Sequence, residues 1–145
     1  MNRRFSYLLS TNEAIPFYTP RSTDSFRYFL SGDKEAARQS IVARGVGVDK
    51  APNYNTISTD NLGYFRIENP DALTDKCILI LKDSLENPMT DYFTTLYRQV
   101  IVIDPRSYAE PYSFPELAER YGVDLVLFIY HQNNISTELT QFLCG

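Results

Sequence analysis

Three uninterrupted apolar runs in the second half of the chain constrain its fold more than any other feature. They cover residues 77–81, 100–103 and 125–130. A short continuous apolar run is typical of a strand that is covered on both faces of a sheet. Two segments with helical periodicity separate the runs. The order strand, helix, strand, helix, strand predicts right-handed crossovers that build a parallel sheet.

Sequence signals also place the helices. Asn87 and Pro88 have the residue types preferred at a helix N-cap and at the first helical position. Residues 113–116 have capping-box spacing, and Gly122 is suited to end the helix that follows. A last short helix is expected from Ser136. The apolar positions at helical spacing are Met89, Phe93, Leu96 and Tyr97 in the first helix, Phe114, Leu117, Ala118 and Tyr121 in the second, and Leu139, Phe142 and Leu143 in the third.

The N-terminal half has weaker patterns. Residues 26–30 and 41–43 are predicted to be strands around a turn at residues 31–33, and residues 45–63 are predicted to be a loop. Because three parallel strands alone make a thin sheet, this half must add strands, a covering layer, or both. We therefore predict one three-layer α/β domain over residues 1–145, with an irregular part at 1–63 and a core at 64–145.

The net charge of the chain is small, and most of the negative charge lies in the second half. Residues 1–73 carry nine Lys and Arg against eight Asp and Glu, and residues 74–145 carry five against ten, which gives the net charge of −4. Nucleic-acid binding needs clustered cations that replace the counterions of phosphates, and the sequence has no such cluster. It also lacks the roughly 18 uninterrupted apolar residues of a membrane span. We expect neither a nucleic-acid partner nor a transmembrane segment.

The cysteines and the N-terminus say little about location. Cys77 and Cys144 lack Cys-x-x-Cys spacing and nearby histidines, which excludes a zinc or redox motif, and Cys77 is expected in the core. Arg3 and Arg4 resemble the start of a signal peptide, but the apolar stretch after them is too short. We expect a cytoplasmic protein if Met1 is the natural start, and an envelope protein if the chain was trimmed.

Polar side chains follow each predicted strand. In an open parallel sheet, ligands bind beyond the carboxyl ends of the strands. The groups at these ends are Lys82, Asp83, Ser84, Glu86 and Asn87, then Asp104, Arg106 and Tyr108, then His131, Gln132, Asn133 and Asn134. Any strand that enters a loop turns polar, so solvated loop residues are an equally good interpretation of the set.

Ser84 is the most specific of these residues because it lies between a buried strand and the expected start of a helix. Free amide groups at a helix start stabilise an oxyanion. A nucleophilic serine also needs a base, and a third group that orients this base. If the strand ends converge, Ser84, His131 and Asp104 are a candidate catalytic triad. The alternatives are a surface role for His131 and a helix-capping role for Ser84.

Asp83 and Asp104 at neighbouring strand ends also suggest a magnesium site. A phosphatase with such a magnesium site has a second Asp two residues after its nucleophilic Asp. In this chain, Leu85 and Arg106 occupy the positions two residues after Asp83 and Asp104. Residues 45–47 are too short for a phosphate loop and precede no helix. We therefore expect no metal and no cofactor.

Two short elements carry a family resemblance. Residues 82–84 read Lys-Asp-Ser after the first strand, and residues 103–106 read Ile-Asp-Pro-Arg after the second. Together they resemble the C-terminal segment of the DHHW family, bacterial proteins similar to the SGNH-hydrolase-like alginate O-acetylation proteins. The resemblance covers residues 64–140, and more loosely residues 24–45. It implies an SGNH/flavodoxin-like fold that is incomplete in this chain.

The resemblance implies acetyl transfer or ester hydrolysis on cell-envelope polysaccharide, with Ser84 as nucleophile and Asp104 and Arg106 in supporting roles. The family's catalytic Asp and His come from an Asp-His-His-Trp motif upstream of the serine, whereas this chain has no Trp and its only His lies downstream. A missing general base removes a factor of about 10²–10⁴ in rate. We expect an inactive chain unless His131 substitutes, and the missing N-terminal part of the same protein is then a candidate partner.

Two functions from different classes therefore remain open. The first is the serine-bearing part of an acyl-transfer or esterase domain, which acts on a polysaccharide or acyl-ester substrate. Its predicted substrate contacts are Asp83, Asn87, Arg106, Tyr108 and Asn133. The second is a non-catalytic module that binds carbohydrate or a partner protein through the 20 Tyr and Phe residues of the chain. A third hypothesis, a Rossmann-type domain that binds a small ligand, is supported by fold analogy alone.

Overall fold

The structure is a computed structural model that describes residues 3–6, 14–17, 25–41, 59–134 and 137–144. Its centre is a six-stranded mixed sheet with the strand order β4–β3–β5–β7–β6–β8. These strands are β3 (Arg27–Leu30), β4 (Lys34–Ala36), β5 (Tyr64–Glu68), β6 (Thr74–Lys82), β7 (Tyr97–Ile103) and β8 (Leu125–Ile129). A separate antiparallel hairpin consists of β1 (Arg3–Ser6) and β2 (Ala14–Phe17). Within the described part of the chain, no helix has the length and apolar character needed to cross a bilayer.

The three apolar runs form the parallel half of the sheet, as predicted. β6 lies in the middle, with β7 on one side and β8 on the other, and both pairings are parallel. Leu81 of β6 lies opposite Ile103 of β7 and Phe128 of β8. The carboxyl ends of all three strands therefore reach the same edge of the sheet. The prediction of an α/β fold with parallel strands is confirmed.

The N-terminal half adds three antiparallel strands, of which the sequence predicted one correctly. β5 pairs with β7, β3 pairs with β5, and β4 pairs with β3. Across the predicted turn β3 pairs with β4, because Gly32 and Asp33 adopt positive φ angles of 69° and 53° and turn the chain back at once. Of the strand predicted at residues 41–43, Ile41 lies in a turn. Ile41 is buried, and residues 42–43 lie outside the described residues, as does most of the predicted loop at 45–63.

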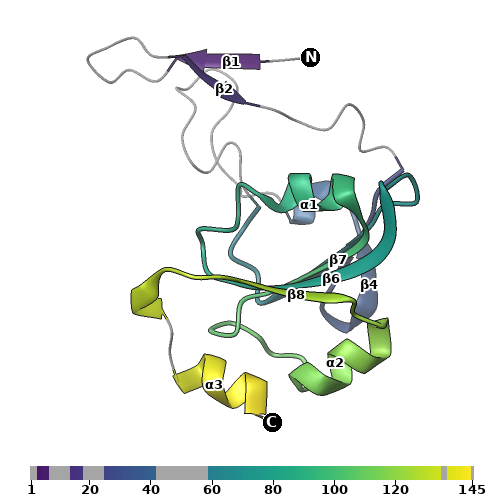
Figure 1. The fold of residues 1–145 in the computed structure, drawn as a ribbon, viewed down its shortest axis with the longest axis vertical. Coiled ribbons are helices and arrows are strands. Elements are labelled where there is room, and N and C mark those ends of the chain that lie inside the picture. The colour runs from purple at the N-terminus through teal and green to yellow at the C-terminus, as the bar shows by residue number, and fades with distance from the viewer. Residues whose placement is uncertain (1–2, 7–13, 18–24, 42–58, 135–136, 145) are drawn as a thin grey trace.

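Helices cover both faces of the sheet (Figure 1). Helix α1 (Thr90–Leu96) lies on one face, and α2 (Phe114–Tyr121) and α3 (Thr137–Cys144) lie on the other. Because side chains alternate along a strand, Ile78 and Ile80 of β6 pack in the core beside α1, whereas Leu79 and Leu81 pack in the core beside α2 and α3. Burial of one such side chain contributes about 1.5–3 kcal/mol. Both cores therefore fix β6 in place.

Helix α1 differs from its prediction. It begins at Thr90 instead of Pro88, because the Asn87 side chain is engaged by Lys82 and Asn61 and does not cap the helix. The expected apolar stripe is only partly confirmed. Phe93 packs against the core, whereas Met89 and Leu96 are exposed and Tyr97 already begins β7.

Helices α2 and α3 agree with their predictions. Ser113 and Glu116 form the capping box at the start of α2, and Gly122 ends it with a left-handed φ of 59°. Leu117 of α2 and Leu139 of α3 are buried in the same core. Ser136, the expected start of the last helix, lies outside the described residues.

Candidate active site

Ser84 occupies the first turn after β6. It is half-buried, and none of the described residues forms a hydrogen bond with its hydroxyl. The amide groups that follow it are already used, since the Leu85 N–H donates to the Asp83 carboxylate at 2.8 Å and the Glu86 N–H donates to the Asp83 carbonyl at 3.3 Å. The helix start that was expected beside Ser84 lies several residues further on, at Thr90. The Ser84 hydroxyl is therefore available to a reagent, but neither the helix nor these two amides supplies an oxyanion site.

Asp83 ties the Ser84 turn to the end of β8. Its side chain is fully buried. Its backbone N–H donates to the Ile129 carbonyl at 3.1 Å, and its carboxylate accepts the backbone N–H of His131 at 2.6 Å. These two bonds hold the turn that contains Ser84 next to the turn that contains His131, at one edge of the sheet. Asp83 thus acts as a structural link between two of the predicted site residues.

Asp104 binds Arg106 instead of a histidine. The Asp104 carboxylate is buried, and it accepts N–H groups from Arg106 at 2.9 Å and 2.6 Å, one on each oxygen. The backbone N–H of Arg106 adds a third bond at 3.1 Å. The pKa of the Arg106 guanidinium is raised, first by its hydrogen bond to Asp104. This pair closes the turn after β7.

His131 reaches the same edge, but its ring faces its own turn. The residue is exposed, and its Nδ1 accepts the backbone N–H of Asn133 at 3.2 Å. In a Ser-His-Asp triad, the corresponding nitrogen donates to the carboxylate and the other ring nitrogen faces the serine. The structure therefore gathers Ser84, Asp104 and His131 at one edge, and within the described residues no hydrogen bond connects their side chains. The triad stays a prediction.

The predicted substrate-binding residues divide into exposed and buried groups. Arg106 and Asn133 are exposed at the edge. The Asn87 amide is buried, where it accepts from Lys82 Nζ at 2.5 Å and donates to Asn61 at 2.9 Å. Tyr108 is half-buried, and its hydroxyl donates to the Tyr112 carbonyl at 2.8 Å. Arg106 and Asn133 are consequently the two of these side chains that meet solvent most freely.

A buried ionisable pair lies beneath the Ser84 turn, and its burial could not be predicted from the residue types. Lys82 and Glu86 are both fully buried. One Glu86 oxygen accepts the Thr90 hydroxyl at 2.8 Å, and the other accepts no hydrogen bond from any residue that the structure describes. Burial raises the pKa of Glu86 to about 7, and burial lowers the pKa of Lys82. Polar residues after a strand usually enter solvent, so only the spacing of four residues connects the two in the sequence.

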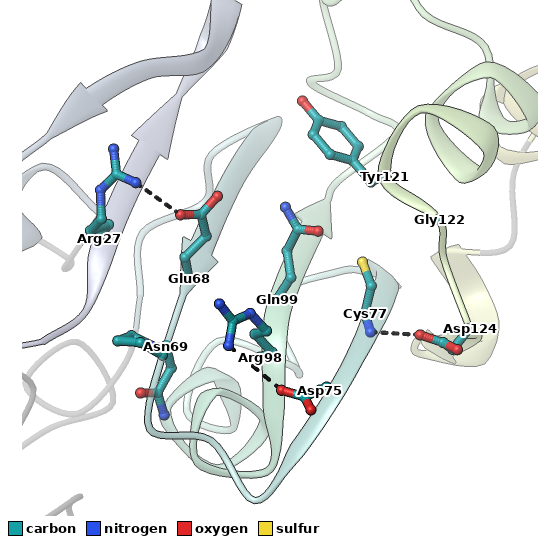
Figure 2. A pocket seen from close by; sticks show the side chains of 11 residues that line it. Arg27, Glu68, Asn69, Asp75, Cys77, Arg98, Gln99, Tyr121, Gly122 and Asp124 are labelled. Carbon is teal, nitrogen blue, oxygen red and sulfur yellow. Dashed lines mark hydrogen bonds and ion pairs between the residues drawn. The ribbon is translucent and has the colours of Figure 1, made fainter.

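A pocket lies at the opposite edge of the sheet, at the start of β6 and β7 (Figure 2). Its volume is about 390 Å³, and Cys77, Gln99, Tyr121 and Asp124 are among the residues that line it. A strand rises about 3.3 Å per residue, so Cys77 lies roughly 16 Å from Lys82 along β6. Burial raises the pKa of the Cys77 thiol to about 12, which keeps it protonated and a poor nucleophile. This pocket is separate from the edge that holds Ser84.

Comparison with solved structures identifies similar folds. PatB1 from Bacillus cereus matches with a TM-score of 0.70 and 23% identity over 97% of this chain and 49% of PatB1. PatB1 with a sulfonyl adduct matches with a TM-score of 0.69 and 21% identity, over 99% of this chain and 48% of PatB1. A DHHW family protein from Eubacterium siraeum DSM 15702 matches with a TM-score of 0.56 and 22% identity, over 82% of this chain and 39% of that protein.

These similarities concern the fold. This chain spans about half the length of PatB1, and less of the DHHW family protein. No protein-family model matches the sequence, and neither does any curated protein. The α/β fold is therefore shared with PatB1 and with a DHHW family protein, which agrees with the resemblance of the Lys-Asp-Ser and Ile-Asp-Pro-Arg elements.

Proposed function

We propose that this chain supplies the nucleophile-bearing edge of an acyl-transfer or ester-hydrolysing domain, with Ser84 as the attacking residue. The half-buried hydroxyl after the central parallel strand carries this proposal, because none of the described residues bonds to it and it lies where ligands bind in such sheets. The fold similarity to PatB1 supports it. One solved structure of PatB1 carries a sulfonyl adduct.

In the proposed step, Ser84 Oγ attacks the carbonyl carbon of an acyl ester. A bond forms between Oγ and this carbon, the ester alcohol leaves, and the Oγ proton passes to a base. Nothing in the described residues orients a base toward Oγ, since Nδ1 of His131 accepts from Asn133 and Asp104 is held by Arg106. We expect the chain alone to react slowly. The proposed substrate of a site completed by a base is a cell-envelope polysaccharide ester.

Acetylation by p-nitrophenyl acetate tests the proposal. The chain is incubated with the ester, with and without imidazole as an external base, and the acetyl group is then located by mass spectrometry of peptides. We expect acetyl on Ser84, and more of it when imidazole is present. Ser107, an exposed serine after the neighbouring strand β7, is the matched internal control. Equal acetylation of Ser84 and Ser107 would overturn the proposal.

The second candidate function, non-catalytic carbohydrate binding, is favoured by a small pocket of about 170 Å³. Tyr64, Tyr112 and Tyr121 line it together with Arg120 and Asp33. Aromatic rings that stand beside charged hydrogen-bonding groups suit the apolar face and the hydroxyls of a sugar. Titration with acetylated and unmodified oligosaccharides separates the candidates. A binding module keeps its affinity after Ser84→Ala and loses it after Tyr112→Ala.

A further inference from the structure

The segment 59–63 crosses the edge of the sheet that holds Ser84. It leads directly into β5, whose first residue, Tyr64, pairs with Ile103, the last residue of β7. Because β5 and β7 are antiparallel, the start of β5 lies at the carboxyl end of β7. None of the site residues predicted from the sequence comes from this segment.

Backbone hydrogen bonds join this segment to two turns of the candidate site. The Thr59 N–H donates to the Asn87 carbonyl at 3.1 Å, which joins the segment to the turn after β6. The Asp104 N–H donates to the Gly63 carbonyl at 3.0 Å, which joins the segment to the turn after β7. The segment therefore bridges the turn that contains the candidate nucleophile and the turn that follows the neighbouring strand.

A chain of side-chain hydrogen bonds runs from Lys82 to Asn61, the central residue of this segment. Lys82 Nζ donates to Asn87 Oδ1 at 2.5 Å, and Asn87 Nδ2 donates to Asn61 Oδ1 at 2.9 Å. Lys82 and Asn87 are buried, whereas Asn61 is exposed. The chain of bonds therefore leads from the core to the surface of the molecule at the edge that holds the candidate site.

The ammonium group of Lys82 fixes the direction of every bond in this chain. An ammonium group only donates, so the atom of the Asn87 side chain that faces it must be the carbonyl oxygen. The other end of the Asn87 amide is then its NH₂ group, which donates and requires the carbonyl oxygen of Asn61. Burial lowers the pKa of Lys82, whereas the carboxyl groups of Glu86 and Asp104 favour its charged form. The NH₂ group of Asn61 is consequently the end of the chain.

This NH₂ group has no acceptor among the residues that the structure describes. The backbone N–H of Asn61, by contrast, donates to the Asp60 carboxylate at 2.8 Å. The protein thus orients the Asn61 amide through its oxygen and leaves two N–H donors at the surface. A donor that is already oriented loses little conformational entropy when it binds an acceptor.

We propose that Asn61 is a further ligand-binding residue of the Ser84 site, and that its NH₂ group donates to an oxygen of the substrate. Asn87 and Lys82 are positioning residues, because they act through Asn61 and do not touch the ligand. The inference rests on the proposed function, since it adds a contact to the site of the acyl ester. In a polysaccharide ester, the sugar hydroxyls and the acyl carbonyl are oxygens that accept such a bond.

NMR titration of the isotope-labelled chain with an O-acetylated xylo-oligosaccharide tests the binding role. The Asn61 side-chain amide signal is assigned by its absence in Asn61→Ala, and we expect it to shift as the sugar is added. Asn61→Ala should weaken binding about three- to tenfold, the effect of one hydrogen bond, and should fold because Asn61 is exposed. The deacetylated sugar identifies the acceptor, because only a contact with a hydroxyl survives without the acetyl group. An Asn61 signal that moves with neither sugar would overturn the proposal.

Asn87→Asp tests the direction of the bonds without changing Asn61. A carboxylate at this position still accepts from Lys82 but cannot donate, so the Asn61 amide should turn its NH₂ group inward. We expect this variant to bind the acetylated sugar as weakly as Asn61→Ala, and its Asn61 NH₂ protons to exchange more slowly with water. Gln99→Glu makes the same change of amide to carboxylate at the opposite edge of the sheet, and it should keep the natural affinity. Natural affinity in Asn87→Asp, with a fold confirmed by circular dichroism, would contradict the positioning role.

The outcomes for Asn61 and for Ser84 are distinguishable. Sugar binding that depends on Asn61, in a chain whose Ser84 is never acetylated by p-nitrophenyl acetate, would support the binding role and remove the nucleophile. Acetylation of Ser84, together with sugar binding that is lost in Tyr112→Ala and unchanged in Asn61→Ala, would overturn the binding role alone.

Discussion

Individual residues at the turn after β6 show how the fold places charge beneath a candidate nucleophile. Lys82, Asp83 and Glu86 are fully buried within five positions of the chain. Asp83 is satisfied by backbone N–H groups, and Lys82 by the Asn87 amide, but one Glu86 oxygen accepts no hydrogen bond within the described part of the chain. A buried carboxylate without full pairing is costly. Glu86 should therefore control how the stability of this turn depends on pH.

The pH dependence of unfolding tests the state of Glu86. Its pKa is about 7 in the folded protein against the ordinary value of 4.5, so the folded state binds a proton more readily than the unfolded state. The Glu86 contribution to stability is therefore full below about pH 4.5 and is lost as pH rises toward about 7. At pH 8, Glu86→Gln should be more stable than the natural chain by about 2–4 kcal/mol, and near pH 4 the two should converge. Urea unfolding at several pH values measures this difference.

Glu119→Gln is the control for this prediction, because Glu119 is exposed on α2. It should change the unfolding free energy little at any pH. A Glu86→Gln variant that is less stable than the natural chain at pH 8 would contradict the account, since it would show that the charged form is stabilised in the fold.

Gly63 controls the position of the turn after β7. A Cβ atom at Gly63 would lie 1.9 Å from the Ser107 carbonyl oxygen, and this oxygen belongs to backbone that cannot rotate away. The Gly63 carbonyl also accepts the Asp104 N–H at 3.0 Å. Gly63→Ala should destabilise the protein by at least about 3 kcal/mol, by overpacking at the start of β5. Thermal unfolding measures the loss.

Gly122→Ala separates this clash from backbone strain. Gly122 has a positive φ of 59° but open space around its Cα, so alanine there should cost only about 1 kcal/mol. If Gly122→Ala proves as costly as Gly63→Ala, close approach to Ser107 is not the reason that Gly63 is needed.

At the scale of elements, α2 is the helix whose ends are defined best by local contacts. The Ser113 N–H donates to the Glu116 carboxylate at 2.7 Å, and burial of Leu117 anchors the helix to the core. Ser113→Ala should cost about 1 kcal/mol, because it leaves helix N–H groups without an acceptor. Chemical unfolding measures this cost. Ser107→Ala, a change in an exposed serine outside any helix, should have almost no effect, and an equal effect of both changes would refute the capping role.

The difference between local and long-range contacts explains what the sequence could predict. The three parallel strands and α2 were predicted well, because a continuous apolar run and a capping box are local signals. The start of α1 was not, because Asn87 binds Lys82 and Asn61, and Asn61 lies far away in the sequence. β5 was missed because its composition, including Arg66 and Glu68, does not mark a strand, and its burial comes from pairing with β7.

For the site, the sequence predicted the common edge of Ser84, Asp104 and His131, since the edge follows from parallel strands alone. It could not predict that Arg106 binds Asp104, or that Nδ1 of His131 accepts from Asn133. Both contacts depend on the conformation of turns, for which the residue types leave several options. The burial of Glu86 depends in the same way on how the turn folds under Thr90.

The whole molecule combines a parallel half, which carries the candidate site, with an antiparallel half, which extends the sheet. The fold is shared with PatB1, of which the chain spans about half. The proposed chemistry depends on one hydroxyl at the centre of the parallel half.

Covalent labelling with a fluorophosphonate tests the central claim most directly. The reagent phosphonylates nucleophilic serines, and peptide mapping then identifies the modified residue. We expect slow labelling at Ser84 alone, with complete loss in Ser84→Ala and unchanged labelling in Ser107→Ala. A chain that remains unlabelled, or that is labelled equally in Ser84→Ala, would contradict the assignment of Ser84 as the nucleophile.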